Sequence, residues 1–121
     1  MAISAQAREI LDIAVAACEA KLGVNPVALE VTERMPFTDV FLIVSAETPR
    51  QVNAIANEVV DELVKHGHKR AKLEGKDEAS WILVDCRDVI VHVMLDEKRE
   101  YYALERLWAD APRLEINVTP R

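Results

Sequence analysis

The sequence predicts an α/β protein in which helices flank one mixed β-sheet. Two segments, 4–22 and 48–66, place apolar residues three and four positions apart, which is the spacing of one face of an α-helix. Two other segments, 39–45 and 89–95, are short apolar runs rich in β-branched residues, typical of strands covered on both faces. Because such strands need helices to cover them, the combination favours an α/β architecture.

The first helix is expected to begin at Ser4, whose hydroxyl can cap the free N–H groups of the first turn. We expect Gly23 to end this helix in a left-handed conformation and Pro26 to prevent its continuation. A short strand is predicted over residues 27–32. The apolar face of the helix consists of Ala7, Ile10, Leu11, Ala14, Cys18 and Leu22.

The second helix has a well-marked start. Thr48 and Gln51 form a capping box, and Pro49 occupies the first helical position, where its missing N–H is not needed. Gly67 is expected to end the helix. Beyond it, strands are predicted over residues 70–73 and 81–84, separated by a charged loop at 74–78. The apolar face of this helix consists of Val52, Ile55, Ala56, Val59 and Leu63.

The last third of the chain reads as turn, strand and helix. Residues 85–88 lack the Asn-Gly or Asp-Gly of a tight hairpin, so a looser turn or a bulge is expected before the strand at 89–95. Asp96 can cap a final helix that runs to about Trp108 and stops before Pro112. We expect a single domain over residues 1–121, with a core at about 4–112 and a short, partly extended tail.

The location of the protein is predicted from what the sequence lacks. No apolar run approaches the ~20 residues that span a bilayer, and the N-terminal segment has no signal-peptide pattern. The two cysteines, Cys18 and Cys86, do not form a disulfide framework. We therefore expect a cytoplasmic chain with reduced cysteines and no contact with a membrane.

The chain is acidic, with a formal net charge of −6 and a pI near 5.1. Because an acidic protein gains no counterion-release energy from a phosphate backbone, the charge argues against nucleic acid as the main ligand. It suits a basic protein partner, since opposite charge speeds association. Ordinary solubility explains the same charge, so both interpretations stay open at this point.

No motif for a cofactor or metal is recognisable. The three glycines are isolated, so no phosphate-binding loop is indicated. His66 and His68 could form half of a metal site, but no further ligand lies nearby in sequence, and a solvated helix end is favoured. We expect no cofactor and no metal.

An enzymatic function is disfavoured. Asp85 and Asp88 lie three residues apart around a turn, whereas a two-metal nucleotidyl-transfer site needs carboxylates that alternate along a strand. His92 lies inside a predicted buried strand, where a histidine is usually a hydrogen-bonded structural residue. No serine or cysteine has an obvious general base.

Aromatic residues instead indicate a binding module. Tyr101 and Tyr102 are adjacent, and a helix cannot bury both, so at least one should reach the surface. Leu104 and Trp108 are four residues apart and are expected to face the core. Trp81 begins a neighbouring strand. Because tyrosine and tryptophan dominate interface hot spots, these residues predict a partner surface.

The same segment carries a family resemblance that extends over nearly the whole chain. Its motifs are Trp81-x-Leu83-x-Asp85-x-x-Asp88-Val89-x-Val91-His92-Val93, Arg99-x-Tyr101-Tyr102-x-Leu104-Glu105-x-Leu107-Trp108-x-Asp110-Ala111-Pro112, Thr38-Asp39-x-Phe41, Arg50-Gln51 and Glu74-Gly75. Together they resemble the ribosomal silencing factor family, also called Iojap. The chain departs from the family pattern at Val40, at Ser45-Ala46 and at Arg87, where the family often has tyrosine, Thr-Gly and glycine.

The resemblance implies a nucleotidyltransferase-like α/β fold without the catalytic residues. It also implies a homodimer that binds large-subunit ribosomal protein fourteen on the subunit-joining face, blocks joining of the small subunit, and lowers translation when nutrients are scarce. No sequence-specific nucleic acid contact is expected. The alternatives are a divergent nucleotidyltransferase-type enzyme using His92, Asp85 and Asp88, and a dimerisation scaffold. The hypothesised partner surface consists of Asp39, Glu74, Asp77, Trp81, Asp85 and Tyr101. A structural role is expected for Leu104, Trp108 and His92.

Overall fold

The computed structural model describes residues 3–118, which form one six-stranded sheet with helices on both faces. The strand order is β3-β4-β5-β2-β1-β6. Only the central pair, β2 and β5, is parallel, and the other neighbours are antiparallel, so the predicted mixed sheet is confirmed. The strands are β1 (Val24–Glu30), β2 (Val40–Ala46), β3 (Lys72–Glu74), β4 (Trp81–Asp85), β5 (Val89–Leu95) and β6 (Arg113–Leu114).

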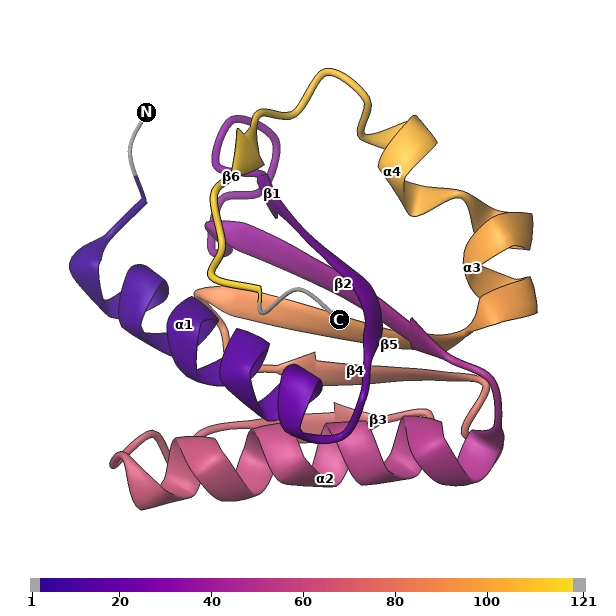
Figure 1. Ribbon diagram of the computed structural model, residues 1–121. Coiled ribbons are helices and arrows are strands. Elements are labelled where there is room, and N and C mark those ends of the chain that lie inside the picture. The colour runs from indigo at the N-terminus through magenta and orange to yellow at the C-terminus, as the bar shows by residue number, and fades with distance from the viewer. Residues whose placement is uncertain (1–2, 119–121) are drawn as a thin grey trace.

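The helices divide between the two faces of the sheet. Helices α1 (Ala5–Ala20) and α2 (Pro49–Lys65) pack together against one face, whereas α3 (Asp96–Tyr102) and α4 (Leu104–Leu107) follow β5 on the other (Figure 1). All seven residues of β2 are buried, as expected for a strand with cover on both sides. The strands predicted at 39–45, 70–73, 81–84 and 89–95 lie within two residues of their expected bounds.

Both long helices begin as predicted. The Ser4 hydroxyl accepts the Ala7 N–H at 3.0 Å, and the Thr48 hydroxyl accepts the Gln51 N–H at 3.1 Å. Each bond satisfies a backbone donor that the first turn of a helix leaves free. Pro49 occupies the start of α2, where the N–H that proline lacks would have no partner within the helix. These caps fix where the two helices meet the sheet.

The end of α1 corrects the role given to Gly23. The left-handed residue is Leu22, with a φ of 61°, one position earlier than expected. Gly23 is required for a different reason, since a Cβ there would meet the Val44 Cγ2 at 2.6 Å. The chain passes so close to β2 at this point that only a residue without a side chain fits.

The first strand begins three residues earlier than predicted. Pro26 lies inside β1 rather than before it, next to Asn25, which has a φ of 45°. The pairing of β1 with β2 is irregular between Val24 and Val27, and such a bulge accommodates a proline that cannot donate a ladder hydrogen bond.

The predicted helix over 96–108 is wrong, because the chain breaks at Ala103. That residue has φ 46° and ψ 53°, so α3 ends and α4 starts in a new direction. Asp96 is also not the capping residue, since Leu95 holds that position and no side chain caps the helix. The break lets Leu104 reach the core, whereas no residue of α3 is buried.

The sheet extends past the expected end of the core at residue 112. Strand β6 pairs antiparallel with β1, with Leu114 opposite Ala28, and Ile116 packs on the core cluster beneath α1 and α2. Two residues were too few for a strand pattern in the sequence, so this edge was expected only as a partly extended tail.

The turn between β4 and β5 is tighter than predicted, because the strands pair without a bulge up to Asp85 opposite Ile90 and the Asp88 N–H donates to the Cys86 carbonyl at 2.9 Å. Arg87 has a φ of 70°, and its backbone N–H donates to the Asp85 carboxylate at 2.8 Å. The Cys86 N–H donates to the Val89 carbonyl at 2.9 Å and closes the turn. A left-handed residue at this position explains why glycine would suit it.

Candidate partner-binding surface

A row of aromatic contacts crosses the sheet on the face that carries α3 and α4. We call these side chains the aromatic row. Neighbouring ring centroids lie 4.7–6.0 Å apart, within or close to the range of favourable aromatic pairs. In order, the members are Tyr101, Tyr102, Trp81, His92, Phe41 and Trp108.

The aromatic row runs from solvent into the core. Tyr101 is 79% exposed and Tyr102 is 47% exposed, so the prediction that at least one tyrosine reaches the surface is confirmed for both. Phe41 is only 7% exposed, and Trp108 is half-buried against the same apolar cluster as Leu104. The tyrosine end of the row can therefore contact a partner, while the other end is anchored in the sheet.

Trp81 connects the two ends. Its indole Nε1–H donates to the His92 Nδ1 at 3.2 Å. Burial lowers the pKa of His92 to about 4, so the ring is neutral at pH 7 and can accept this bond. The Nε2 atom of His92 is buried and has no hydrogen-bond partner among the described residues. This arrangement fixes the indole ring against the sheet.

A groove of about 640 Å³ lies beside the exposed edge of Trp81. Its lining includes Tyr102 and Lys98 from α3, and Asp77 and Glu78 from the loop after β3. Gly75 brings this loop close to β4, with a φ of 86° and no room for a Cβ beside the Trp81 carbonyl. Lys76 also lines the groove, which therefore combines aromatic walls with two acidic and two basic side chains.

Arg99 holds α3 in place. The guanidinium donates to both carboxylate oxygens of Glu105, at 3.0 and 3.2 Å, and so bridges the break at Ala103. It also donates to the carbonyls of Val24 at 2.9 Å and Asn25 at 2.7 Å, and to the Ser45 hydroxyl at 3.2 Å. Because α3 buries no residue of its own, this polar clamp positions the tyrosines.

The six hypothesised partner residues fall into two groups at opposite ends of the sheet. Glu74, Asp77, Trp81 and Tyr101 lie at the end where α3 begins. Asp85 is four residues along β4 from Trp81, or about 13 Å. Asp39 lies with Asp88 at that far end, where its backbone N–H donates to the Asp88 carbonyl at 2.8 Å. The six residues therefore do not form one cluster.

Three further exposed or groove-lining residues were not predicted as partner residues. Lys98 carried no motif, and Leu107 lies in the family motif but was not assigned to the surface, although it is 68% exposed on α4. Tyr102 was recognised only as a neighbour of Tyr101, although it contacts Trp81 directly. The adjacent tyrosines were a usable signal, but their directions depend on the helix break, which the pattern did not reveal.

The residues of the enzymatic alternative do not converge. The carboxylate of Asp85 accepts a bond within its own turn, while His92 pairs with Leu83 and Ile43 in the middle of the sheet. His66 and His68 have separate contacts, to the Glu62 carbonyl and to the Glu9 carboxylate. Within residues 3–118, no group of three or more His, Cys, Asp or Glu side chains is placed to hold a metal ion. Nor is any helix in that range long and apolar enough to cross a membrane.

Comparison with known proteins identifies the family of this chain. Residues 4–121 match the family model described as ribosomal silencing factor during starvation. The chain belongs to the ribosomal silencing factor family. A ribosomal silencing factor from Bacillus subtilis is 43% identical over 110 residues, covering 91% of this chain and 93% of that protein. Family members are ribosome-associated translation regulators, and the name describes a regulatory factor rather than an enzyme.

Solved structures of the family share the fold. A crystal structure of a Chromobacterium violaceum protein matches with a TM-score of 0.81 at 32% identity, covering 98% of this chain and 95% of that one. A structure from Bacillus halodurans matches with a TM-score of 0.78 at 38% identity, covering 89% and 98%. The mixed α/β architecture predicted from the sequence is thus that of ribosomal silencing factors.

Proposed function

We propose that this ribosomal silencing factor binds large-subunit ribosomal protein fourteen through the exposed end of the aromatic row. The bound protein blocks joining of the small subunit and lowers translation when nutrients are limiting. The observation that carries the proposal is the exposed pair Tyr101 and Tyr102, in which Tyr102 contacts a Trp81 ring that is hydrogen-bonded to His92.

The contact chemistry suits a protein partner. Tyrosine and tryptophan bury large areas with little rotamer entropy, and rings that are already fixed lose less of it on binding. Asp77 and Glu78 line the adjoining groove, and Glu74 lies on the neighbouring edge strand. With a net charge of −6, the chain favours a basic ribosomal protein and associates with it faster.

Steric exclusion needs only a folded obstacle on the joining face. A globular chain of 121 residues has a radius of gyration of about 14 Å. Bound on the joining face of the large subunit, a chain of this size keeps the small subunit beyond contact distance. A mouse relative, 38% identical over 84 residues, is named mitochondrial assembly of ribosomal large subunit protein 1, which supports the choice of the large subunit.

The proposal includes the accompanying assignments. We propose that the chain acts in the cytoplasm as a single non-enzymatic domain, forms the homodimer that the family resemblance implies, and needs no cofactor. Leu107, exposed on α4, offers further apolar area for the ribosomal protein or for a second copy of the chain.

Binding is tested with the purified ribosomal protein and three variants. Trp81→Ala, Tyr101→Ala and Glu74→Lys are each expected to weaken binding, the aromatic changes by about 2 kcal/mol or roughly 30-fold. Phe37→Ala is the matched control, because Phe37 is also 72% exposed but lines a different pocket. If the well-folded variants all bind as tightly as the parent, the surface is misplaced.

Function is tested by sedimenting purified small and large subunits with and without the protein. Added parent protein should keep the subunits apart, and Tyr101→Ala should do so only at higher concentration. Subunits that join normally at a saturating concentration of parent protein would contradict the proposed block.

A further inference from the structure

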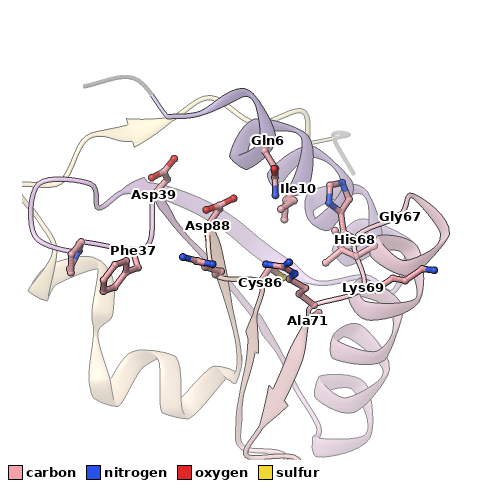
Figure 2. Close-up of a pocket in the computed structure, with 14 residues that line it drawn as sticks. Gln6, Ile10, Phe37, Asp39, Gly67, His68, Lys69, Ala71, Cys86 and Asp88 are labelled. Atoms are coloured by element: carbon pink, nitrogen blue, oxygen red, sulfur yellow. The ribbon is translucent and has the colours of Figure 1, made fainter.

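A second and larger hollow lies at the opposite end of the sheet from Trp81 and the exposed tyrosines. Its volume is about 750 Å³, and the start of α1, the segment after α2 and the turn between β4 and β5 surround it. Figure 2 shows Phe37, Asp39 and Asp88 on one side of this hollow and His68 and Lys69 on the other. We call it the basic pocket, after Lys69, Arg70 and Arg87 in its lining.

Part of a cation-rich segment lines the basic pocket. Residues 65–76 hold five of the 15 lysines and arginines in the chain and only one acidic residue, Glu74. The segment carries a formal charge of +4 in a protein whose total is −6, so the remainder carries −10. Arg87 adds a further cation from the turn across the pocket. Of the five, Lys69 and Arg70 line the basic pocket, whereas Lys65 pairs with Glu62 and Lys76 lines the groove beside Trp81.

The cations of the basic pocket are available to a ligand. Lys69, Arg70 and Arg87 are exposed and form no ion pair or side-chain hydrogen bond with any of residues 3–118. Other arginines are engaged, since Arg34 pairs with Asp110 and Arg99 with Glu105. Arg87 projects from a left-handed turn that the Asp85 carboxylate holds.

We propose that the basic pocket binds the sugar–phosphate backbone of RNA, independently of sequence. The proposal rests on the proposed function, since the RNA would be that of the large subunit beside the protein partner. Unpaired arginines on an exposed rim bind a polyanion by releasing its counterions, which a small anion does not provide. Phe37, with its ring 72% exposed at the rim, offers a face on which one base can stack.

The acidic residues of the pocket limit where the RNA lies. Asp39 and Asp88 would repel a phosphate, so the backbone contacts the charged groups of Lys69, Arg70 and Arg87 and not these carboxylates. The carboxylate of Asp39 already accepts the Ser4 N–H at 3.0 Å and serves to position the start of α1. Because the two faces lie at opposite ends of the sheet, protein and RNA can be bound together.

The test compares two double variants that change the charge equally. Arg70→Glu/Arg87→Glu alters the pocket, and Lys21→Glu/Arg50→Glu alters exposed residues outside its lining. Affinity for purified large subunits is measured from low to moderate KCl concentration. The pocket variant should lose at least tenfold in affinity relative to the control variant. Its slope of log K against log[KCl] should be shallower by about 1.4, or ~0.7 for each lost contact with a single strand.

Binding to isolated large-subunit ribosomal protein fourteen separates the two proposals. The pocket variant should bind that protein as tightly as the parent does. Equal subunit affinity and slope for both double variants would overturn the RNA contact, as would loss of binding to the isolated protein in the pocket variant alone. If the parent fails to bind the isolated protein while the difference in salt slope persists, the RNA contact stands and the proposed protein partner falls.

Discussion

The indole N–H of Trp81 and the Nδ1 of His92 form a hydrogen bond of 3.2 Å that joins the surface to the core. An indole N–H can only donate, so the Nδ1 must accept, and the proton of the neutral imidazole is on Nε2. The acceptor and donor lie on neighbouring strands, with His92 opposite Leu83 and Trp81 opposite Met94. Replacing either partner therefore affects both stability and the tyrosine surface.

Trp81→Phe tests this bond while keeping an aromatic ring. The change leaves the buried Nδ1 of His92 without its partner, so the free energy of unfolding should fall by about 1–3 kcal/mol. Trp108→Phe is the control, because the Trp108 ring makes no hydrogen bond with residues 3–118, and its loss should be smaller. Urea unfolding at pH 7 measures both, and equal losses would show that the hydrogen bond contributes nothing.

Stability should fall in mild acid because of His92. Its pKa is lowered from 6.5 to about 4 by burial, so the unfolded chain takes up a proton below pH 6.5 and the folded chain does not until about pH 4. The free energy of unfolding therefore decreases as pH drops through this window, by about 2 kcal/mol between pH 7 and pH 5. His92→Gln removes the titrating group, and its loss between those pH values should be smaller by that amount. Parallel curves for parent and variant would contradict the assignment.

Two glycines with nearly the same φ separate steric clash from backbone strain. Gly75 and Gly67 have φ values of 86° and 88°. A Cβ at Gly75 would clash with the Trp81 carbonyl, whereas one at Gly67 meets nothing within 4 Å. Gly67→Ala should cost about 1–2 kcal/mol for the left-handed backbone alone. Gly75→Ala should cost more and also weaken partner binding, as thermal unfolding and affinity measurements can show. Equal costs would mean that the loop moves freely away from β4.

Arg99→Gln should loosen α3 without unfolding the sheet. The side chain of Arg99 is only 12% exposed, and its bonds to Glu105 and to two carbonyls of β1 hold a helix that buries nothing. We expect a loss of about 2 kcal/mol and faster amide exchange in α3 but not in α2. Arg34→Gln is the control, since its exposed pair with Asp110 should contribute at most ~1 kcal/mol. Unchanged exchange in α3 would refute the clamp.

Local patterns in the sequence were sufficient for most of the elements. Ser4 and Thr48 act as caps because capping depends on residues only three positions apart. The buried strands β2 and β5 were recognisable because a continuous β-branched run is compatible with little else. The family motifs lie mainly in these elements and their connections, so the family can be recognised from the sequence alone.

The failures share a physical cause, which is dependence on residues distant in the chain. Gly23 is required by Val44, which lies 21 residues away on another strand. The break at Ala103 depends on Arg99 reaching Glu105 and β1, and alanine carries no signal for a left-handed conformation. Strand β6 exists because β1 offers it an open edge.

The sequence by itself determined the fold class, the family, the two long helices and the presence of exposed aromatic residues near residue 101. Only the tertiary structure decided which acidic residues lie close to these aromatic residues. Strand β4 carries Trp81 at one end and Asp85 at the other, so side chains that are neighbours in a motif lie at opposite ends of the sheet. Which acidic residues lie beside Trp81 depends on how β3 pairs with β4, and pairing is a property of the whole sheet rather than of any segment.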